Sequence, residues 1–534
     1  MPVTIDFENA RSRVVGLRPE DRRQLQRLVS FRDKALPPAS IQTLIKGFTT
    51  KLKRRRGIEI EHQMFVTRLA GQMTELGYDP AQLTRRLYAN ALYNRGLWDG
   101  WTSLIASDGS FGSGLVDHVT RALTLRMGLP PPTIVDRRRP PPQPQNVWVP
   151  SPPPLFDFQA EALAAWLHAG GRGVVDLPPR AGKTRIMVAA VQALRLPTLL
   201  VVPKIALVEQ TVDRFLELGF RAGDVIGVTG GVSSLSKKKQ RALARALVWV
   251  TTPGTAAGRK GTDGARSGMP GIESRAVLIL DEFHHAAADT YQSISIAARN
   301  AYYRLGATGT FHRSDGADLK MLSVLSRAIY SRSVEAMIAL GRLVPGVVGM
   351  FRVPGGPVTA QDGTAYGVGI SRHDERNRLV IQAARLLAHH GKRVLVLTKE
   401  VEHARQIAAG IPGAEQVDGS NNQEVRPALQ RLEEGTLRVL VGTNVIGEGV
   451  DVPNADALVY AAGGRSPNRV VQDFYRVLTG GIAGKTHGLI VDFADDHHPA
   501  LMRHAAQRLA LYRRCFKATV HGPGELEAFV RLAV

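Results

Sequence analysis

One octapeptide, LPPRAGKT at Leu177–Thr184, constrains the fold of this 534-residue chain more than any other segment. It follows the apolar run Gly173–Leu177 and opens the helix-like pattern RIMVAAVQAL, so the order is strand, tight loop and helix. Such a loop directs backbone N–H groups and a helix N-terminus at phosphate oxygens. Lys183 would then reach the β- and γ-phosphates, and the Thr184 hydroxyl would ligate Mg²⁺. The predicted nucleotide-binding residues of this loop are Pro179, Arg180, Ala181, Gly182, Lys183 and Thr184.

A second segment, LILDEFHH, supplies the acids that such a site needs. The apolar strand Ala276–Leu280 ends in Asp281 and Glu282, which places both carboxylates at the carboxyl end of the strand. Asp281 would hold Mg²⁺ and Glu282 would orient the attacking water. A GKT triplet alone is also typical of an ordinary helix-opening loop, but the acidic strand end favours a nucleotide hydrolase.

Charge and composition indicate the kind of partner. The chain has 69 Lys and Arg residues against 47 Asp and Glu, a net charge of +22, which favours a polyanion such as nucleic acid. A drift of the coding sequence toward Arg would give the same excess. The single cysteine, Cys515, excludes an internal disulfide and a Cys-based zinc site. With neither a membrane-length apolar run nor a signal-peptide pattern, a cytoplasmic location is expected.

The excess charge is concentrated in residues 1–60, which carry 14 Lys and Arg against six Asp and Glu. Helix-like spacing there predicts a basic helical extension. Its densest run, Lys51–Arg56, favours phosphate contacts, although a solvated face would have the same composition. The residues predicted to bind nucleic acid here are Lys51, Arg54 and Arg55. Residues 61–150 are expected to form a DNA-recognition domain that ends in the Pro-rich stretch Leu129–Pro154.

From Leu155 onward the pattern alternates between apolar strands and amphipathic helices. Segments such as PTLLVVP and AVLILDE form one series, and KRVLVLT, RVLVGT, ALVYAA and GLIVDF form a second. This alternation predicts an α/β fold of two parallel-sheet domains in tandem, over residues 151–345 and 346–534, the second with C-terminal helices. They would follow a smaller α+β domain.

Besides the phosphate loop, seven motifs resemble, in order, those of superfamily 2 helicases: LFDFQ, VVPKIALVEQ, TTPGT, DEFHH, GATGTFHRSDG, GTNVIGEGVDVP and QDFYRVLTG. The resemblance implies two RecA-like domains with ATP and Mg²⁺ in their cleft. It implies that Phe156 and Gln159 contact adenine. It also implies that His284 couples ATP hydrolysis to work on nucleic acid. Glu448, Gly449 and Asp451 would line the opposite wall with the catalytic residues Gln472 and Arg476. Implied contacts to the nucleic-acid backbone come from Pro203, Lys204, Thr252, Pro253, Arg313, Thr398 and Thr443.

A closer resemblance is to the phage recombination and repair helicases of the UvsW kind, distant relatives of XPB. It is carried by RGLWDGWTSLIASDGSFGSGLVDHV before the motor and by VDFADDHHPALMRHAAQRLALY after it. The resemblance implies work on branched or partly single-stranded DNA in recombination, repair or replication restart. It also implies 3′-to-5′ movement, and a monomer is expected.

Two departures from the helicase pattern bear on turnover. Arg180 replaces a glycine of the phosphate loop, and in the arginine-finger motif Asp473, Tyr475 and Thr479 replace arginine, glycine and arginine. Only Arg476 is left as a finger, so turnover is expected to be slow. Three alternatives stay open at this point: a DNA-binding protein with a weak ATPase, an RNA helicase, and the motor subunit of a restriction or defence system.

Overall fold

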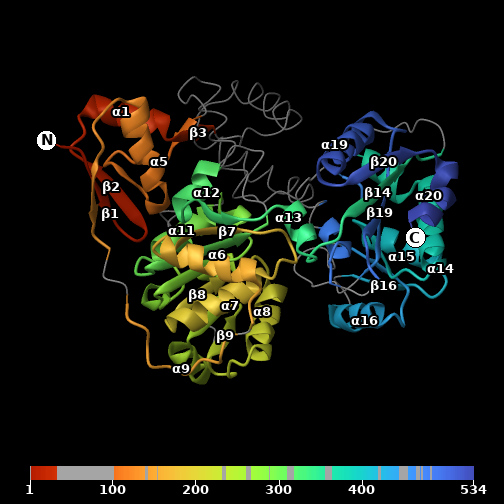
Figure 1. Cartoon of the computed structure of the whole chain (residues 1–534), viewed down its shortest axis with the longest axis horizontal. Coiled ribbons are helices and arrows are strands. Elements are labelled where there is room, and N and C mark those ends of the chain that lie inside the picture. The colour runs from red at the N-terminus through yellow and green to blue at the C-terminus, as the bar shows by residue number, and fades with distance from the viewer. Residues whose placement is uncertain are drawn as a thin grey trace, which may run out of the picture. The chain divides into compact units, whose positions relative to one another are not determined.

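The computed structural model describes most of the chain (Figure 1). The described residues are 2–32, 101–138, 142–152, 154–230, 232, 236–259, 266–287, 289–309, 318–354, 364–418, 422–443, 455–464, 470, 473–481 and 484–533. Among them, no helix combines the length and apolar character needed to cross a membrane. The chain divides into two compact units, one of residues 1–141, 284–302 and 312–327, the other of the remaining residues.

The first unit is built on a four-stranded sheet in the order β5-β2-β1-β6. β1 (Thr4–Phe7) pairs antiparallel with β2 (Arg11–Val15) and parallel with β6 (Thr133–Asp136), and β2 pairs with β5 (Ser110–Gly112). Its other elements are α1 (Pro19–Leu28), β3 (Ser30–Arg32), β4 (Trp101–Ser103), η1 (Ser113–Leu115), α5 (Val116–Arg121), η2 (Ala122–Arg126), η5 (Phe283–Ala287, mostly in this unit), α11 (Asp289–Ala297) and α12 (Asp318–Val324).

This sheet corrects the expectation of a separate helical extension over residues 1–60, as far as residues 4–32 are described. Helix α1 falls where a helix was predicted, but β1 and β2 are strands of the same sheet as β5 and β6. In β2 the side chains of Ser12 and Val14 are buried while Arg11 and Arg13 face outward. The alternation is that of a half-buried strand, and the prediction of a helical extension took its helical spacing from later segments, beginning at Asp21, and not from β2.

The second unit contains two seven-stranded sheets, and the first, sheet domain 1, has the order β13-β7-β12-β11-β8-β10-β9. All its strand pairs are parallel. The strands are β7 (Arg172–Asp176), β8 (Thr198–Val201), β9 (Val225–Val228), β10 (Val248–Thr251), β11 (Val277–Leu280), β12 (Tyr303–Thr308) and β13 (Ala328–Ser331). The helices are α6 (Asp157–His168), α7 (Lys183–Leu194), α8 (Ile205–Glu217), α9 (Lys237–Arg245), α10 (Pro253–Ala256), η4 (Ile272–Ser274) and α13 (Val334–Ala339).

Sheet domain 2 has the order β16-β17-β15-β18-β19-β14-β20, again with parallel pairs. Its strands are β14 (Gly346–Phe351), β15 (Val394–Leu397), β16 (Glu415–Val417), β17 (Val439–Gly442), β18 (Ala457–Tyr460), β19 (Gly488–Phe493) and β20 (Lys517–His521). Its helices are η6 (Gly367–Ser371), α14 (Asp374–His389), α15 (Val401–Ala409), α16 (Asn422–Glu434), η7 (Tyr475–Val477), α19 (Pro499–Cys515), η8 (Pro523–Glu525) and α20 (Leu526–Ala533). The predicted tandem of two parallel-sheet α/β domains is confirmed.

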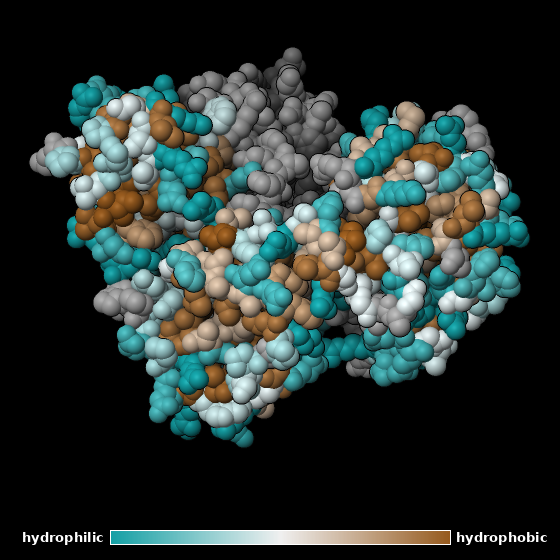
Figure 2. All heavy atoms as spheres, in the orientation of Figure 1, coloured by the Kyte–Doolittle hydropathy of each residue, from teal (hydrophilic) through white to brown (hydrophobic). Residues whose placement is uncertain are grey.

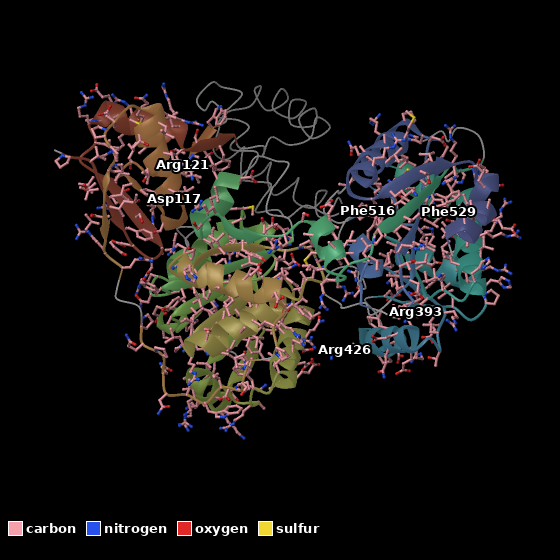
Figure 3. The ribbon with its side chains drawn as sticks, in the orientation of Figure 1. Asp117, Arg121, Arg393, Arg426, Phe516 and Phe529 are labelled. Atoms are coloured by element: carbon pink, nitrogen blue, oxygen red, sulfur yellow. The ribbon has the colours of Figure 1, made fainter. Side chains whose placement is uncertain are left out.

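Helices pack against these sheets and bury their strands. The four residues of β8, β10, β11, β15, β17 and β18 are all buried, which is why these strands read as continuous apolar runs. On one face of sheet domain 2, Phe529 of α20 packs edge-on against Phe351 of β14, with ring centroids 5.5 Å apart (Figure 3). Because the strands are parallel, the loops that follow them gather at one edge of each sheet, where ligand sites of such folds lie.

Candidate nucleotide and nucleic-acid site

The phosphate loop connects β7 to α7 in sheet domain 1. Gly182, the residue before the helix, has a left-handed backbone with φ of 75°. At this φ a side chain would be strained, and a Cβ would also lie 2.5 Å from Nε2 of Gln159, so the position favours glycine. The result is a narrow backbone turn at a helix N-terminus, the arrangement that suits a phosphate group.

Lys183 follows that turn, and its side chain folds back over the loop. Its Nζ donates hydrogen bonds to the carbonyl oxygens of Leu177 at 3.2 Å and Pro178 at 3.4 Å. Its ammonium therefore lies against the loop that would surround the phosphates. Thr184 stands next to it in the first turn of α7 and is half-buried. The residues present fit a nucleotide triphosphate with Mg²⁺.

Gln159 and Phe156 occupy the positions predicted to contact adenine, but the structure gives both a further partner. The side chain of Gln159 is buried, accepts from the backbone N–H of Phe156 at 3.1 Å and donates to the carbonyl of Ala181 at 2.9 Å. It thereby ties the start of α6 to the phosphate loop. The guanidinium of Arg342 lies 3.4 Å from the centroid of the Phe156 ring. Arg342 was missed by sequence reasoning because no motif contains it.

The acid pair lies directly after β11. The backbone N–H of Asp281 donates to Val201 at 2.9 Å, and that of Glu282 donates to the Asp281 carboxylate at 2.9 Å. Glu282 has φ of 46°, a left-handed conformation that is uncommon for a residue with a side chain. Strained residues of this kind gather at functional sites, so the backbone supports the prediction that Glu282 has a special role. The next predicted residue, His284, is buried in η5.

The segment after β12 packs on the phosphate loop. The backbone N–H of Leu177 donates to the carbonyl of Thr308 at 2.9 Å. A Cβ on Gly309 would lie 3.0 Å from Cδ of Pro179, so this glycine allows close approach of the two segments. The loops after β7, β11 and β12 thus meet at one edge of sheet domain 1.

Of the residues predicted to touch nucleic acid, some face solvent and others are buried. Lys204 is exposed at the start of α8, with Pro203 half-buried before it. Thr252 and Pro253 are half-buried, and the Thr252 hydroxyl caps α10 by accepting from the backbone N–H of Thr255 at 3.5 Å. In sheet domain 2, Thr398 and Thr443 are buried, and the Thr398 hydroxyl donates to the carbonyl of Glu400 at 3.2 Å.

Several predicted site residues lie outside the described part of the chain. They are Lys51, Arg54, Arg55, Arg313, Glu448, Gly449, Asp451 and Gln472. Their predicted roles stay predictions.

Arg476, the residue predicted to act as the finger, lies in η7 of sheet domain 2 and is buried. Its Nε is 3.5 Å from Oδ1 of Asp473, the acid that replaces the first arginine of the helicase motif. The pKa of Arg180 is lowered to about 10, first by burial and then by the charge of Arg476, with Glu433 opposing. The field of Arg476 therefore reaches the phosphate loop, and an anion between the two arginines would relieve their repulsion. Like Gly182, Arg180 is left-handed, with φ of 71°.

A buried ion network supports the loop that leads from β18 toward Arg476. Arg508 of α19 binds Asp492 at 2.8 Å and donates to the carbonyl of Gly464 at 2.9 Å. Arg376 of α14 binds Asp495 at 2.7 Å and donates to the carbonyl of Ala461 at 2.9 Å. Both arginines therefore hold backbone carbonyls of residues 461–464. Sequence reasoning missed this network because its members come from three separate elements.

The arrangement defines the chain as a P-loop nucleotide hydrolase with two tandem parallel-sheet domains. Residues 153–313 match the family "Type III restriction enzyme, res subunit", and residues 376–480 match "Helicase conserved C-terminal domain". The DNA 3'-5' translocase XPB2 of Sulfurisphaera tokodaii is 28% identical over 366 residues, 61% of this chain and 78% of that protein. The DNA 3'-5' helicase XPB of Kineococcus radiotolerans is 26% identical over 323 residues, 58% of this chain and 54% of that protein.

Among solved structures, T4 UvsW is 17% identical, with 98% of this chain and 99% of that chain covered and a TM-score of 0.42. More narrowly, the matched regions and relatives show that the chain is related to the superfamily 2 helicases of the XPB kind, as its motifs predicted.

Proposed function

We propose that this protein is an ATP-dependent DNA helicase or translocase that acts on branched or partly single-stranded DNA, in recombination, repair or replication restart. The observation that carries the proposal is the meeting of the phosphate loop, the acids after β11 and the segment after β12 at one sheet edge. The names of the XPB relatives, DNA 3'-5' translocase and helicase, support DNA as the substrate and 3′-to-5′ as the direction.

The roles follow from the positions of the side chains. Lys183 and Thr184 would bind the phosphates and Mg²⁺ with Asp281, and the bound ion would neutralise charge on the phosphates. Glu282 would orient the attacking water, and Arg476 would meet the charge that develops on the γ-phosphate. Lys204 and Thr252 would hold one strand by its phosphates, which carries no sequence information and predicts sensitivity to salt.

The proposal is tested by the ATPase rate without nucleic acid and with single-stranded DNA, duplex DNA, a four-way junction and RNA. DNA should stimulate the rate, and the junction should stimulate it most. Lys183→Ala and Glu282→Gln should abolish turnover, and Glu282→Gln should still bind ATP because Asp281 and the loop are intact. A Glu282→Gln protein that hydrolyses ATP at the parent rate would rule out this assignment. Equal stimulation by RNA would rule out DNA specificity.

A second candidate is a DNA-binding protein with a weak ATPase. The observation that favours it is the ion pair between Arg476 and Asp473, because a finger held by a neighbouring carboxylate is less available to a phosphate. Its signature is tight DNA binding together with an ATPase rate that DNA does not change.

A further inference from the structure

Helix α9 of sheet domain 1 has a composition that its own fold does not require. Its nine residues, KKKQRALAR, contain five cations, and the sequence from Ser236 to Leu247 contains no acid. Leu243 is the one buried residue of the helix, and the other eight are exposed. The helix is therefore attached to the domain along one narrow face, and its charged surface faces solvent. Figure 2 shows hydrophilic residues at the end of the domain where α9 is drawn in Figure 1.

The outward face carries a regular stripe of three cations. At 100° per residue, Lys238, Arg241 and Arg245 fall within about 60° of one another, on the side opposite Leu243. At 1.5 Å per residue the stripe is about 10 Å long, which is the axial rise of about three nucleotides of a DNA strand. The stripe therefore has the length and the charge to contact a few successive phosphates of one DNA strand.

The start of α9 is electrostatically unfavourable. Lys237, Lys238 and Lys239 fill its first turn, which holds no acidic residue. The N-terminal end of a helix carries partial positive charge, so cations there oppose the helix dipole. The Ser236 hydroxyl, which accepts from the backbone N–H of Lys239 at 3.4 Å, caps the helix but leaves this repulsion in place. A bound anion such as a phosphate group would offset it.

The position of α9 connects it to a predicted nucleic-acid contact. β9 and β10 are parallel neighbours, so the segments after them leave the same sheet edge. After β9, the backbone N–H of Gly230 donates to the Thr255 hydroxyl at 3.3 Å, and that hydroxyl in turn accepts from Thr252 at 3.2 Å. Gln240 of α9 donates to the carbonyl of Val232 in the same connection, at 3.4 Å. Hydrogen bonds thus link the Thr252 motif to the first turns of α9.

We infer that the stripe Lys238, Arg241 and Arg245 binds the phosphate backbone of the nucleic acid that passes Thr252, and so extends the track beyond the helicase motifs. The inference rests on the proposed function, since it needs a strand on that edge. The stripe acts on affinity and not on chemistry, because none of its residues belongs to the nucleotide site.

The test is the variant K238Q/R241Q/R245Q in the full chain, with DNA affinity measured as a function of salt. Loss of three phosphate contacts should lower the salt slope by about 2 to 3 and weaken binding about tenfold or more at moderate salt. The ATPase rate at saturating DNA should stay within about twofold of the parent. The charge-conserving variant K238R/R241K/R245K should bind like the parent.

A matched control removes three charges elsewhere. R385Q/K392Q/K517Q changes residues at or near the amino ends of β15 and β20, the edge opposite the site of sheet domain 2. This control variant should leave the salt dependence of DNA affinity unchanged. If the two triple variants lost DNA affinity equally, the effect would come from net charge alone and the inference would be wrong. An α9 variant whose DNA affinity has the same salt dependence as the parent would also overturn it. A parent that does not bind DNA would instead contradict the proposed function.

Discussion

The two sheet domains share a fold but handle buried charge differently. In sheet domain 1, burial lowers the pKa of Arg275 to about 10 and that of Arg304 to about 9. In sheet domain 2, burial alone would lower the pKa of Arg508, but Asp492, then Tyr512 and Asp495, raise it well above its usual range. In the first domain burial dominates the pKa of these two arginines, whereas the second places acids beside its buried arginines Arg376 and Arg508.

The loops at the carboxyl ends of the strands also differ between the two domains, in how their backbone conformation is held. In sheet domain 1 the phosphate loop and the acid pair contain left-handed residues, Arg180 and Glu282, so backbone strain contributes to their shape. Among the described non-glycine residues of sheet domain 2, the left-handed one is Asp495, which forms ion pairs with Arg376 at 2.7 Å and Arg508 at 3.2 Å. The comparison indicates that the site loops of sheet domain 1 are shaped by local backbone, whereas the segment after β19 in sheet domain 2 is held by long-range ion pairs.

The largest expected effect concerns Arg476 of sheet domain 2, the residue proposed as the arginine finger. Arg476→Ala should lower DNA-stimulated ATP hydrolysis by about 10³-fold or more, with little change in ATP affinity. Arg476→Lys should restore little, because an ammonium does not reproduce the guanidinium fork. Rates at saturating ATP and DNA, with nucleotide binding measured separately, check this. An unchanged rate in Arg476→Ala, on a parent without DNA stimulation, would favour the weak-ATPase candidate.

The buried network of sheet domain 2 should be far more sensitive to mutation than a buried arginine of sheet domain 1. Arg508→Met leaves the buried Asp492 without its cationic partner, with only the Tyr512 hydroxyl and the Phe493 N–H as donors, and should lower the free energy of unfolding by about 3–5 kcal/mol. Arg275→Met loses hydrogen bonds to Ala246 and Ser274, and should cost about 1–3 kcal/mol.

Calorimetric unfolding of both variants measures this difference directly. Arg508→Lys is the matched control, because it keeps the positive charge but loses the several hydrogen bonds of the guanidinium group. If Arg275→Met were as damaging as Arg508→Met, the contrast between the domains would be wrong.

A histidine should make sheet domain 2 sensitive to acid. His403 is buried, its Nε2 donates to Oδ1 of Asn377 at 2.9 Å, and its pKa is lowered to about 3 by burial and then by the charge of Arg376. Its pKa in the unfolded chain is about 6.5, so between pH 6.5 and pH 3 the unfolded state binds more protons. Stability should therefore fall as pH falls through that window, by up to about 1.4 kcal/mol per pH unit.

The measurement is the free energy of unfolding between pH 7.5 and pH 5 for the parent and His403→Gln. In His403→Gln, the part of the pH dependence of unfolding free energy that comes from His403 should disappear. His389→Gln, at an exposed histidine of α14, is the control and should keep it. A parent slope identical to that of His403→Gln would contradict the assignment.

The smallest effect tests the strain in the phosphate loop. At φ of 71°, Arg180→Gly should be more stable than Arg180→Ala by about 1 kcal/mol, because only glycine adopts this backbone without a Cβ clash. Both variants remove the charge that faces Arg476, so their difference isolates the backbone. Thermal unfolding of the pair gives the comparison. An alanine variant at least as stable as the glycine variant would show that the loop is not strained at this position.

Sequence reasoning worked best where a residue's role depends on its neighbours along the chain. The octapeptide of the phosphate loop, the acids at the end of a strand and the alternation of strands and helices are local patterns. Each reflects a local requirement: a turn before a helix, a strand end, or a strand buried on both faces. They were sufficient for the two parallel sheets and for the relation to helicases, while the nucleotide site that they predict in sheet domain 1 stays a prediction.

Tertiary structure decided the features that join distant segments. The segment that carries the outward arginines Arg11 and Arg13 is identified as strand β2 by its pairing with β5, about a hundred residues later in the chain. Arg342 on Phe156, Gln159 on the phosphate loop and the network around Arg508 also need the folded chain, because each partner comes from another element. The reason is physical: the desolvation of a charge is offset only by the partner that packs against it, and the sequence does not state which partner that is.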